Sequence, residues 1–399
     1  MTVVDTVLTG EAKYQEILAT VKSVAGRVAE RRNEIDEDRR FPLDLFEELE
    51  AVGTFKVCGP RKFGGHELNL NQANELIIEG ARGTGSMGWL MMVSTAQSIG
   101  GGLYPEETVA RNNSQHKFLR TRGVIAPKGK AVPVEGGYMV SGQWPFASGG
   151  PKPHYVSGHC IIQGEDGKPL IGPNGPASIM ALLPANQVEF LDTWHTLGMR
   201  GTDSCDVRVK DVFVPENETF DLLTAETCFD TPAGRLPLRV SLSFTHCALA
   251  LGIAEGSLDD VVKIAMSKSA SMNPQALLRN DPLFRDALGR NRLRLTSLRC
   301  TLDQITQNAW NAGVENRQLT PEEILTARGL SNFITQECLG IVNWAYQAGG
   351  STSVYNGSSL QMRLRDINVA TQHAACSADP YRLMSAVLLG EELTPRELF

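Results

Sequence analysis

Apolar residues recur with helical spacing through the first hundred positions of the chain. Over Glu11–Arg31 they stand three and four residues apart, which places them on one face of an amphipathic helix. A second helix is predicted from Pro42, because proline fits a first turn, and two more are predicted over Leu70–Arg82 and Ser86–Ile99. The last helix carries several methionines around Trp89, which favours packing in the core over lining a ligand site.

The hydrophobic pattern changes near residue 120, where short strand-like runs separated by Gly, Pro and Asn replace the helical spacing. Two such runs flank Gly136 and Gly137 and predict a hairpin. Further strands are predicted over Tyr155–Ile162, Ala177–Leu183, Val188–Phe190 and Val207–Val214. The connections are too short for parallel crossovers, so this block is expected to be an antiparallel barrel or sandwich.

From about Leu238 the helical spacing returns. The predicted helices cover Leu242–Val262, Leu283–Ala312, Pro321–Ala348 and Pro380–Leu389, enough for a four-helix bundle. Thr320 gives the third of these helices a capping hydroxyl directly before its first proline. The predicted fold class is therefore α+β, with an N-terminal helical domain over residues 1–122, a central β domain over 123–225 and a C-terminal helical bundle over 226–399.

Composition and charge narrow the function classes without identifying one. The 399 residues include 42% hydrophobic and 21% charged positions, which is typical of a globular protein with a sizeable core. A formal net charge of -7 argues against nucleic acid or an anionic membrane as the main partner. The eight cysteines are dispersed without metal-ligand spacing, and no segment resembles a secretory signal or a membrane span. We therefore expect a cytoplasmic protein without a metal site.

Two segments, Ser141–Gly150 and Gly198–Ser204, combine hydroxyls and glycines with apolar or aromatic residues at the ends of strand-like runs. Such segments can give a flat, partly apolar ring a wall and a few hydrogen bonds, so we interpret them as a flavin site. Gly83–Gly88 has the GxGxxG spacing of a dinucleotide site. It follows a helical pattern instead of a strand, however, so a Rossmann fold is not indicated.

Several motifs occur in an order that resembles the acyl-CoA dehydrogenase superfamily. They are Gly142-x-x-x-x-x-Ser148-Gly149, then Trp194-x-x-x-Gly198-Met199-Arg200-Gly201-Thr202-x-Ser204, then Val207-x-Val209-x-Asp211-Val212-Phe213-Val214-Pro215, and finally Gln347-Ala348-Gly349-Gly350-Ser351 followed by Leu364-Arg365-Asp366. The resemblance covers nearly the whole chain. It implies a homotetramer in which the last of these segments meets the flavin of a neighbouring subunit.

A dehydrogenase of this superfamily needs a group that is missing here. Removal of a weakly acidic proton next to a thioester requires a positioned carboxylate, usually a glutamate just after the Arg-Asp segment. The corresponding stretch, Ile367–Ala375, contains no glutamate, and the alternative location, Leu238–Ala254, contains no acidic residue. The run Trp144-Pro145-Phe146-Ala147-Ser148-Gly149, together with His373, instead resembles the flavin-dependent monooxygenase branch, the oxygenase components of two-component hydroxylases.

This resemblance implies a chemistry and its partners. Reduced FAD or FMN, delivered by a separate NAD(P)H:flavin reductase, would react with O2 to give a C4a-hydroperoxide, which persists where water is excluded. The reaction would hydroxylate a small aromatic or heteroaromatic substrate, such as a phenol or an indole, or N-oxygenate an amine. A histidine that often follows the buried tryptophan in this branch is absent after Trp89, which leaves room for an indole or an amino sugar.

The resemblance also assigns roles to individual residues. Ser148 is expected to bond the N5 side of the flavin, and His373 is expected to serve the substrate as a base or hydrogen-bond partner. The expected cofactor contacts are Trp144, Phe146, Ser148, Gly149, Arg200, Thr202, Ser204, Arg279, Gln347, Gly349, Gly350 and Ser351. Two other interpretations stay open on the sequence: an acyl-CoA dehydrogenase or oxidase whose base lies elsewhere, and a scaffold that kept the fold and lost the chemistry.

Overall fold

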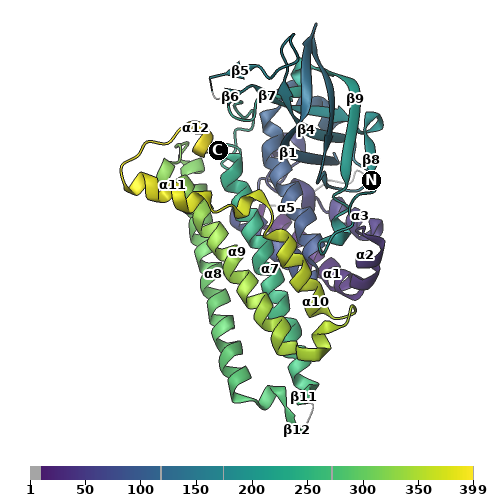
Figure 1. The fold of residues 1–399 in the computed structure, drawn as a ribbon, viewed down its shortest axis with the longest axis vertical. Coiled ribbons are helices and arrows are strands. Elements are labelled where there is room, and N and C mark those ends of the chain that lie inside the picture. Colours follow the sequence, from purple (N-terminus) through teal and green to yellow (C-terminus); the bar gives the residue numbers. More distant parts are fainter. Residues whose placement is uncertain (1–9, 117–118, 174, 271–272, 399) are drawn as a thin grey trace, which may run out of the picture.

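The computed structural model, which describes residues 10–116, 119–173, 175–270 and 273–398, combines a helical part built from both ends of the chain with a central β-sheet (Figure 1). The N-terminal helices are α1 (Gly10–Glu30), α2 (Arg32–Asp38), α3 (Leu43–Ala51), α4 (Leu70–Gly83), α5 (Gly85–Gly100) and α6 (Glu106–Gln115). Thr84 separates α4 from α5, and its hydroxyl accepts the Met87 N–H at 3.2 Å. This N-cap starts α5 at once, so the two helices meet at a tight corner.

The central sheet has the strand order β10-β7-β4-β1-β2-β9-β8, with β3 paired to β1. Its strands are β1 (Thr121–Val134), β2 (Gly137–Trp144), β3 (Ser148–Gly149), β4 (Tyr155–Ile162), β7 (Ser178–Pro184), β8 (Glu189–Leu191), β9 (Asp206–Pro215) and β10 (Thr219–Phe220). The small strands β5 (Ile171–Gly172) and β6 (Gly175–Pro176) pair with each other.

The expectation of a purely antiparallel block is wrong in one place, because β1 and β4 run parallel. The other pairs of the main sheet are antiparallel. A parallel pair needs a long connection, and β2, β3 and the loop to residue 154 together supply it. Strands that follow one another in the sequence are therefore not always neighbours, since the chain returns to the far side of β1 before β4 begins.

The C-terminal helices are α7 (Leu238–Ser267), α8 (Pro282–Val314), α9 (Pro321–Gly349), α10 (Ser359–Ala370), α11 (Asp379–Leu388) and α12 (Pro395–Leu398), with the short strands β11 (Ser269–Ala270) and β12 (Asn273–Leu277) after α7. The first three predicted bundle helices form as α7, α8 and α9. The fourth partner is a correction: α10 packs on α7 and α9, whereas the predicted last helix, α11, packs mainly on α9. Arg363, buried on α10 in an ion pair with Asp260, interrupts the apolar spacing that would have revealed α10.

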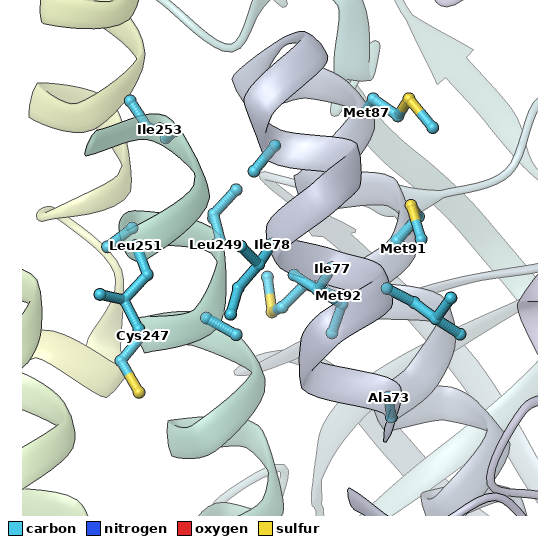
Figure 2. Packing of buried hydrophobic residues seen from close by; sticks show 14 of the residues in the cluster. Ala73, Ile77, Ile78, Met87, Met91, Met92, Cys247, Leu249, Leu251 and Ile253 are labelled. Atoms are coloured by element: carbon cyan, nitrogen blue, oxygen red, sulfur yellow. The ribbon is translucent and has the colours of Figure 1, made fainter. Parts of the chain in front are cut away.

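The main core joins the two helical parts, because α4 and α5 pack directly on α7. Figure 2 shows Ile78 of α4 and Leu249 of α7 meeting between these helices. Gly252 permits the close approach, since a Cβ atom at this position would stand 2.3 Å from the Ile78 carbonyl oxygen. Helix α7 is thereby fixed against α4 and α5, and α5 in turn contacts β1 and β3 of the sheet.

We predict that Gly252→Ala lowers the stability by about 1–3 kcal/mol, the usual cost of overpacking a core. Gly26→Ala is the matched control, because Gly26 lies on α1 and a Cβ atom there would meet nothing within 4 Å. This control should gain about 0.5–1 kcal/mol from the better helix propensity of alanine. Thermal unfolding of both variants tests the packing, and equal melting temperatures would contradict it.

Candidate active site

A cavity of about 1020 Å³ lies between the N-terminal helices, the β-sheet, the start of α7 and the turn after α10. Its wall is mostly apolar and rich in aromatic rings, which come from Phe46, Phe55, Phe63, Trp89, Tyr104, Phe146, Tyr155, Trp194, Phe220 and Phe229. Small-molecule sites usually measure about 300–1000 Å³. The cavity is therefore large enough for a flat cofactor and a small substrate together.

A chain of hydroxyl hydrogen bonds runs from the cavity wall into the β domain. The Trp89 indole N–H donates to the Ser148 Oγ at 3.1 Å, Ser148 and Ser204 share a hydrogen bond of 2.8 Å, and Ser204 and Thr202 share another of 2.8 Å. Ser148 and Trp89 line the cavity, whereas Ser204 and Thr202 lie buried behind them. The two sequence segments interpreted as a flavin site thus meet, and Ser148 is the hydroxyl that faces the cavity.

Local backbone geometry explains how Ser148 reaches the wall. Phe146 has a φ of 63°, and Ala147 donates its N–H to the Cys205 carbonyl at 3.0 Å, so the chain turns sharply before β3. Gly149 is required next, because its φ is 151° and a Cβ atom would stand 2.2 Å from the Thr121 carbonyl oxygen. The turn leaves the Phe146 ring 64% exposed at the cavity, where it meets Trp194 edge to face.

Trp144 lies elsewhere than predicted. Its ring is fully buried in the core of the β-sheet, and its indole N–H donates to the His159 carbonyl at 2.7 Å. It does not line the cavity, so it packs in the sheet core at the end of β2 instead of forming a wall for the cofactor. Strand alternation would place residues 144 and 146 on one face, but β2 ends at Trp144 and the chain turns before β3, so the two rings lie in different environments.

Arg200 does not line the cavity. Its Nε donates to the Asp36 carbonyl oxygen at 2.8 Å, and the guanidinium lies 3.7 Å from the Asp36 carboxylate. Within the chain this ion pair holds the 198–204 loop on the N-terminal domain, and the phosphate contact of Arg200 stays a prediction. Thr202 and Ser204 are likewise not on the cavity wall and act through Ser148.

Arg122 holds the two segments together, although no motif in the sequence pointed to it. Its side chain is 3% exposed and donates to the carbonyl oxygens of Gly150 and Asp203, and it forms an ion pair of 2.9 Å with the Asp203 carboxylate. One guanidinium with fixed donors can bridge two backbone turns in this way. The position of Ser148 therefore depends on a residue at the start of β1.

His373 lines the cavity beside Trp89, with the two ring centroids 5.4 Å apart in an edge-to-face arrangement. Its Nδ1 accepts the Ala375 N–H at 3.2 Å. Burial, together with the nearby positive charge of Arg239, lowers the pKa of His373 to about 4, so the ring is neutral at pH 7. Because Nδ1 accepts a hydrogen bond, the proton stands on Nε2, and His373 presents a donor there.

His246 of α7 is the residue most clearly missed by sequence reasoning. Its ring stacks on His373 with centroids 5.2 Å apart, and its Nε2 lies 3.0 Å from the Ala370 carbonyl oxygen, so Nε2 carries the proton. Its Nδ1 lies 3.6 Å from the Cys376 thiol, which donates. Burial lowers the pKa of His246 to about 3 and raises the pKa of Cys376 to about 12. The pair of stacked imidazoles is consequently neutral.

The remaining predicted contacts, Arg279, Gln347, Gly349, Gly350 and Ser351, do not line the cavity. They follow β12 or end α9, and β11 and β12 lie at the end of the bundle farthest from the sheet (Figure 1). At this end, Lys268 donates to the Thr352 hydroxyl at 3.1 Å. Within a single subunit these residues therefore lie away from the cavity that Ser148 lines. Their contact with the flavin of a neighbouring subunit stays a prediction.

No cluster of three or more His, Cys, Asp or Glu side chains that could hold a metal ion occurs in the described part of the chain. In that same part, no helix is long and apolar enough to cross a bilayer.

We predict that His246 makes stability depend on pH. Its pKa in the folded protein is about 3, below the value near 6.5 of a free imidazole, so the unfolded chain takes up the proton first as the pH falls. The free energy of unfolding that depends on the neutral imidazole is therefore fully present above pH 6.5 and decreases below it. At pH 5 this loss amounts to about 2 kcal/mol. Melting temperatures between pH 7 and pH 5 should therefore fall less steeply for His246→Gln than for the wild type. Parallel curves would show that the imidazole is not held neutral.

Comparison with known proteins gives the family. The family models described as "Acyl-CoA dehydrogenase, N-terminal domain" and "Acyl-CoA dehydrogenase, C-terminal domain" match residues 11–104 and 244–378. The structure of XiaF from Streptomyces sp. in complex with FADH2 and glycerol superposes with a TM-score of 0.89 at 21% identity, covering 97% of each chain. This likeness confirms the predicted fold class.

Curated relatives with a similar sequence are named as monooxygenases and hydroxylases. An indole-3-acetate monooxygenase from Acinetobacter baumannii is 27% identical over 86% of this chain and 85% of its own length. An "FADH(2)-dependent resorcinol hydroxylase, oxygenase component" from Rhizobium sp. is 29% identical over 61% of this chain and 60% of its own. The chain therefore belongs to the acyl-CoA dehydrogenase superfamily, as its sequence motifs predicted, and its curated relatives lie on the monooxygenase branch.

Proposed function

We propose that the protein is the oxygenase component of a two-component flavin-dependent monooxygenase that hydroxylates a small aromatic or heteroaromatic substrate. The observation that carries the proposal is the chain Trp89–Ser148–Ser204–Thr202, with neutral His373 against Trp89, in the wall of an apolar cavity. The names of the curated relatives support the same reaction class.

The alternative function, a dehydrogenase whose catalytic base lies elsewhere in the chain, is not favoured, because the described cavity wall offers no free acidic residue. Among the lining residues that the structure describes, Glu50 is the one carboxylate. Both of its oxygens accept hydrogen bonds from Arg120, at 2.7 and 2.6 Å. Because both oxygens of this carboxylate are taken up by the guanidinium, neither is free to face a substrate proton. Abstraction of a proton next to a thioester therefore lacks a base here.

The residues present fit a flavin. The wall offers the exposed ring of Phe146, backed by the buried ring of Trp194, and the Ser148 hydroxyl provides a hydrogen bond at the edge of a flat ring. When bound in reduced form, FAD or FMN supplies the two electrons and activates O2. The absence of a Rossmann strand-turn-helix before Gly83–Gly88 fits delivery of reduced flavin by a separate reductase.

Side chains of the protein itself can orient ligands in the cavity by donating hydrogen bonds. Trp89 donates to Ser148, so when Ser204 also donates, the Ser148 hydrogen is left for the Phe146 carbonyl, a long contact of 3.4 Å, or for an acceptor in the cavity. His373 offers a second donor at Nε2, and the neutral, stacked imidazoles keep this end of the cavity free of net charge. Apolar walls exclude water, which protects a reactive oxygenating group from hydrolysis.

A homotetramer belongs to the same proposal, because Arg279, Gln347 and Gly350 are exposed at the bundle end remote from their own cavity. A neighbouring subunit could place them at the flavin phosphates, where guanidinium and backbone N–H groups bind well. Size measurement by light scattering tests this part separately.

The function is tested by mixing the full-length protein with reduced FAD or FMN anaerobically, then with oxygen, while absorbance is recorded. We expect a transient band near the blue edge of the visible that outlasts the reoxidation of free flavin. Reoxidation as in free solution, with bleaching of bound oxidised FAD by an acyl-CoA, would instead establish a dehydrogenase.

Ser148→Ala should shorten the lifetime of the transient about tenfold, since a hydrogen bond in a dry site contributes about 1–1.5 kcal/mol. Ser141→Ala is the control, because Ser141 lies on β2 and bonds Asp211 on the surface. An unchanged lifetime in the Ser148 variant would remove this residue from the cofactor site.

A further inference from the structure

The charge of the cavity wall is opposite to that of the chain. The protein carries a formal net charge of -7, yet the charged residues that line the cavity are Lys13, Lys56, Lys62 and Arg120 against the single carboxylate of Glu50. A concave, low-dielectric site lined by one sign of charge concentrates ligands of the other sign. The wall therefore favours an anionic ligand.

Three of the four cations already have a carboxylate partner. Lys13 pairs with Glu16 at 2.8 Å, Lys62 with Glu106 at 2.8 Å, and Arg120 with Glu50 at 2.6 Å. Lys56 differs, because among the described residues no carboxylate lies within 4.0 Å of its ammonium group. Its ammonium donates to a neutral partner, the Asn113 Oδ1, at 3.2 Å.

The Lys56 ammonium is also partly desolvated. Burial lowers the pKa of Lys56, and the more distant charge of Glu50 only partly offsets this shift. A buried charge without a partner is costly, and an anionic ligand would relieve the cost.

The backbone around Lys56 is fixed in advance of binding. Its N–H donates to the Gly53 carbonyl at 3.1 Å, and its own carbonyl accepts the N–H groups of Gly59 and His66 at 3.3 and 3.2 Å. The Lys56 side chain is further anchored by Asn113 of α6. A cation held from two sides loses little freedom when it binds a ligand.

An aromatic wall connects Lys56 with the hydroxyl chain. Phe55, the residue before Lys56, stacks on Phe46 with ring centroids 4.5 Å apart. The far edge of the Phe46 ring lies against Gly150, where a Cβ atom would stand 2.7 Å from it. Since Gly150 follows Ser148 and Gly149, the stacked Phe55 and Phe46 rings connect Lys56 with the segment that carries Ser148.

We propose that Lys56 binds the carboxylate of the substrate, so that the oxygenated compound is an aromatic acid whose ring lies beside Phe55, the half-buried ring of the stacked pair. This inference rests on the proposed function for the oxygenation of that ring, although the binding step does not require it. Asn113 positions the ammonium, and the apolar wall rejects a second charge.

Calorimetric titration of the flavin-free, full-length protein with indole-3-acetate and with indole-3-acetamide tests the site. The two probes differ chiefly in charge. We expect the acid to bind at least about tenfold more tightly than the amide, the size of one charge-assisted hydrogen bond. Lys56→Met should abolish this preference, and Lys56→Arg should retain most of it. Lys62→Met, which removes a cavity lysine already paired with Glu106, should leave it intact.

Equal binding of acid and amide, no binding of either at millimolar concentration, or a preference that survives Lys56→Met would each overturn the proposal. A flavin phosphate is the other anion that Lys56 could hold. In that case Lys56→Met would abolish a preference for FMN over riboflavin and leave the acid preference unchanged, which also overturns it. Because Lys56 is only half-buried and has no carboxylate partner, Lys56→Met should leave the melting temperature close to that of the wild type, and a loss of binding would then not reflect unfolding.

Failure of the proposed function would look different. If the acid preference depends on Lys56 but reduced flavin reoxidises as in free solution, the anion site stands and the monooxygenase assignment fails. If a transient flavin band forms and is indifferent to the charge of the ligand, the monooxygenase assignment stands and the anion site fails.

Discussion

The buried carboxylate of Asp366 holds the three parts of the molecule in register. From α10 it accepts the Met199 N–H of the β domain at 2.7 Å and the Gly85 N–H at the start of α5 at 3.2 Å. Burial raises the pKa of Asp366 to about 6, although the hydrogen bond from Met199 opposes the shift. Trp89 extends from α5, the loop behind Ser148 contains Met199, and His373 follows α10, so the geometry of the candidate site depends on this one group.

The site that results is dry and nearly uncharged at its reactive end. Two stacked imidazoles are kept neutral by burial, and a chain of hydroxyls supplies hydrogen bonds without carrying charge. A dehydrogenase of the same fold needs a free carboxylate at this place, and the one carboxylate on the described cavity wall, Glu50, is neutralised by Arg120. The same fold therefore supports oxygenation instead of dehydrogenation when the free carboxylate of the dehydrogenase is absent.

Beyond the stacked Phe46 and Phe55 rings, the cavity wall carries a positive charge. Lys56 stands there with a neutral partner, in a protein whose overall charge is negative. A cavity with a neutral hydroxyl end and a cationic end is polarised along its length, so it can orient a ligand whose own ends differ in charge. Orientation of the ring toward the flavin would then come from the remote end of the substrate, where no bond changes.

The sequence by itself determined the helical periods, the motifs of the superfamily and the lack of an acidic base, because these are properties of spacing and composition. Only the tertiary structure decided which side chains reach the cavity. The helix carrying Trp89 is apolar on most sides, and spacing cannot tell a neighbour in the core from an open cavity. Trp144 and Arg200 lay in the right motifs but turned to the sheet core and to Asp36. His246 and Arg122 gained their roles from contacts between segments far apart in the chain, which no local pattern encodes.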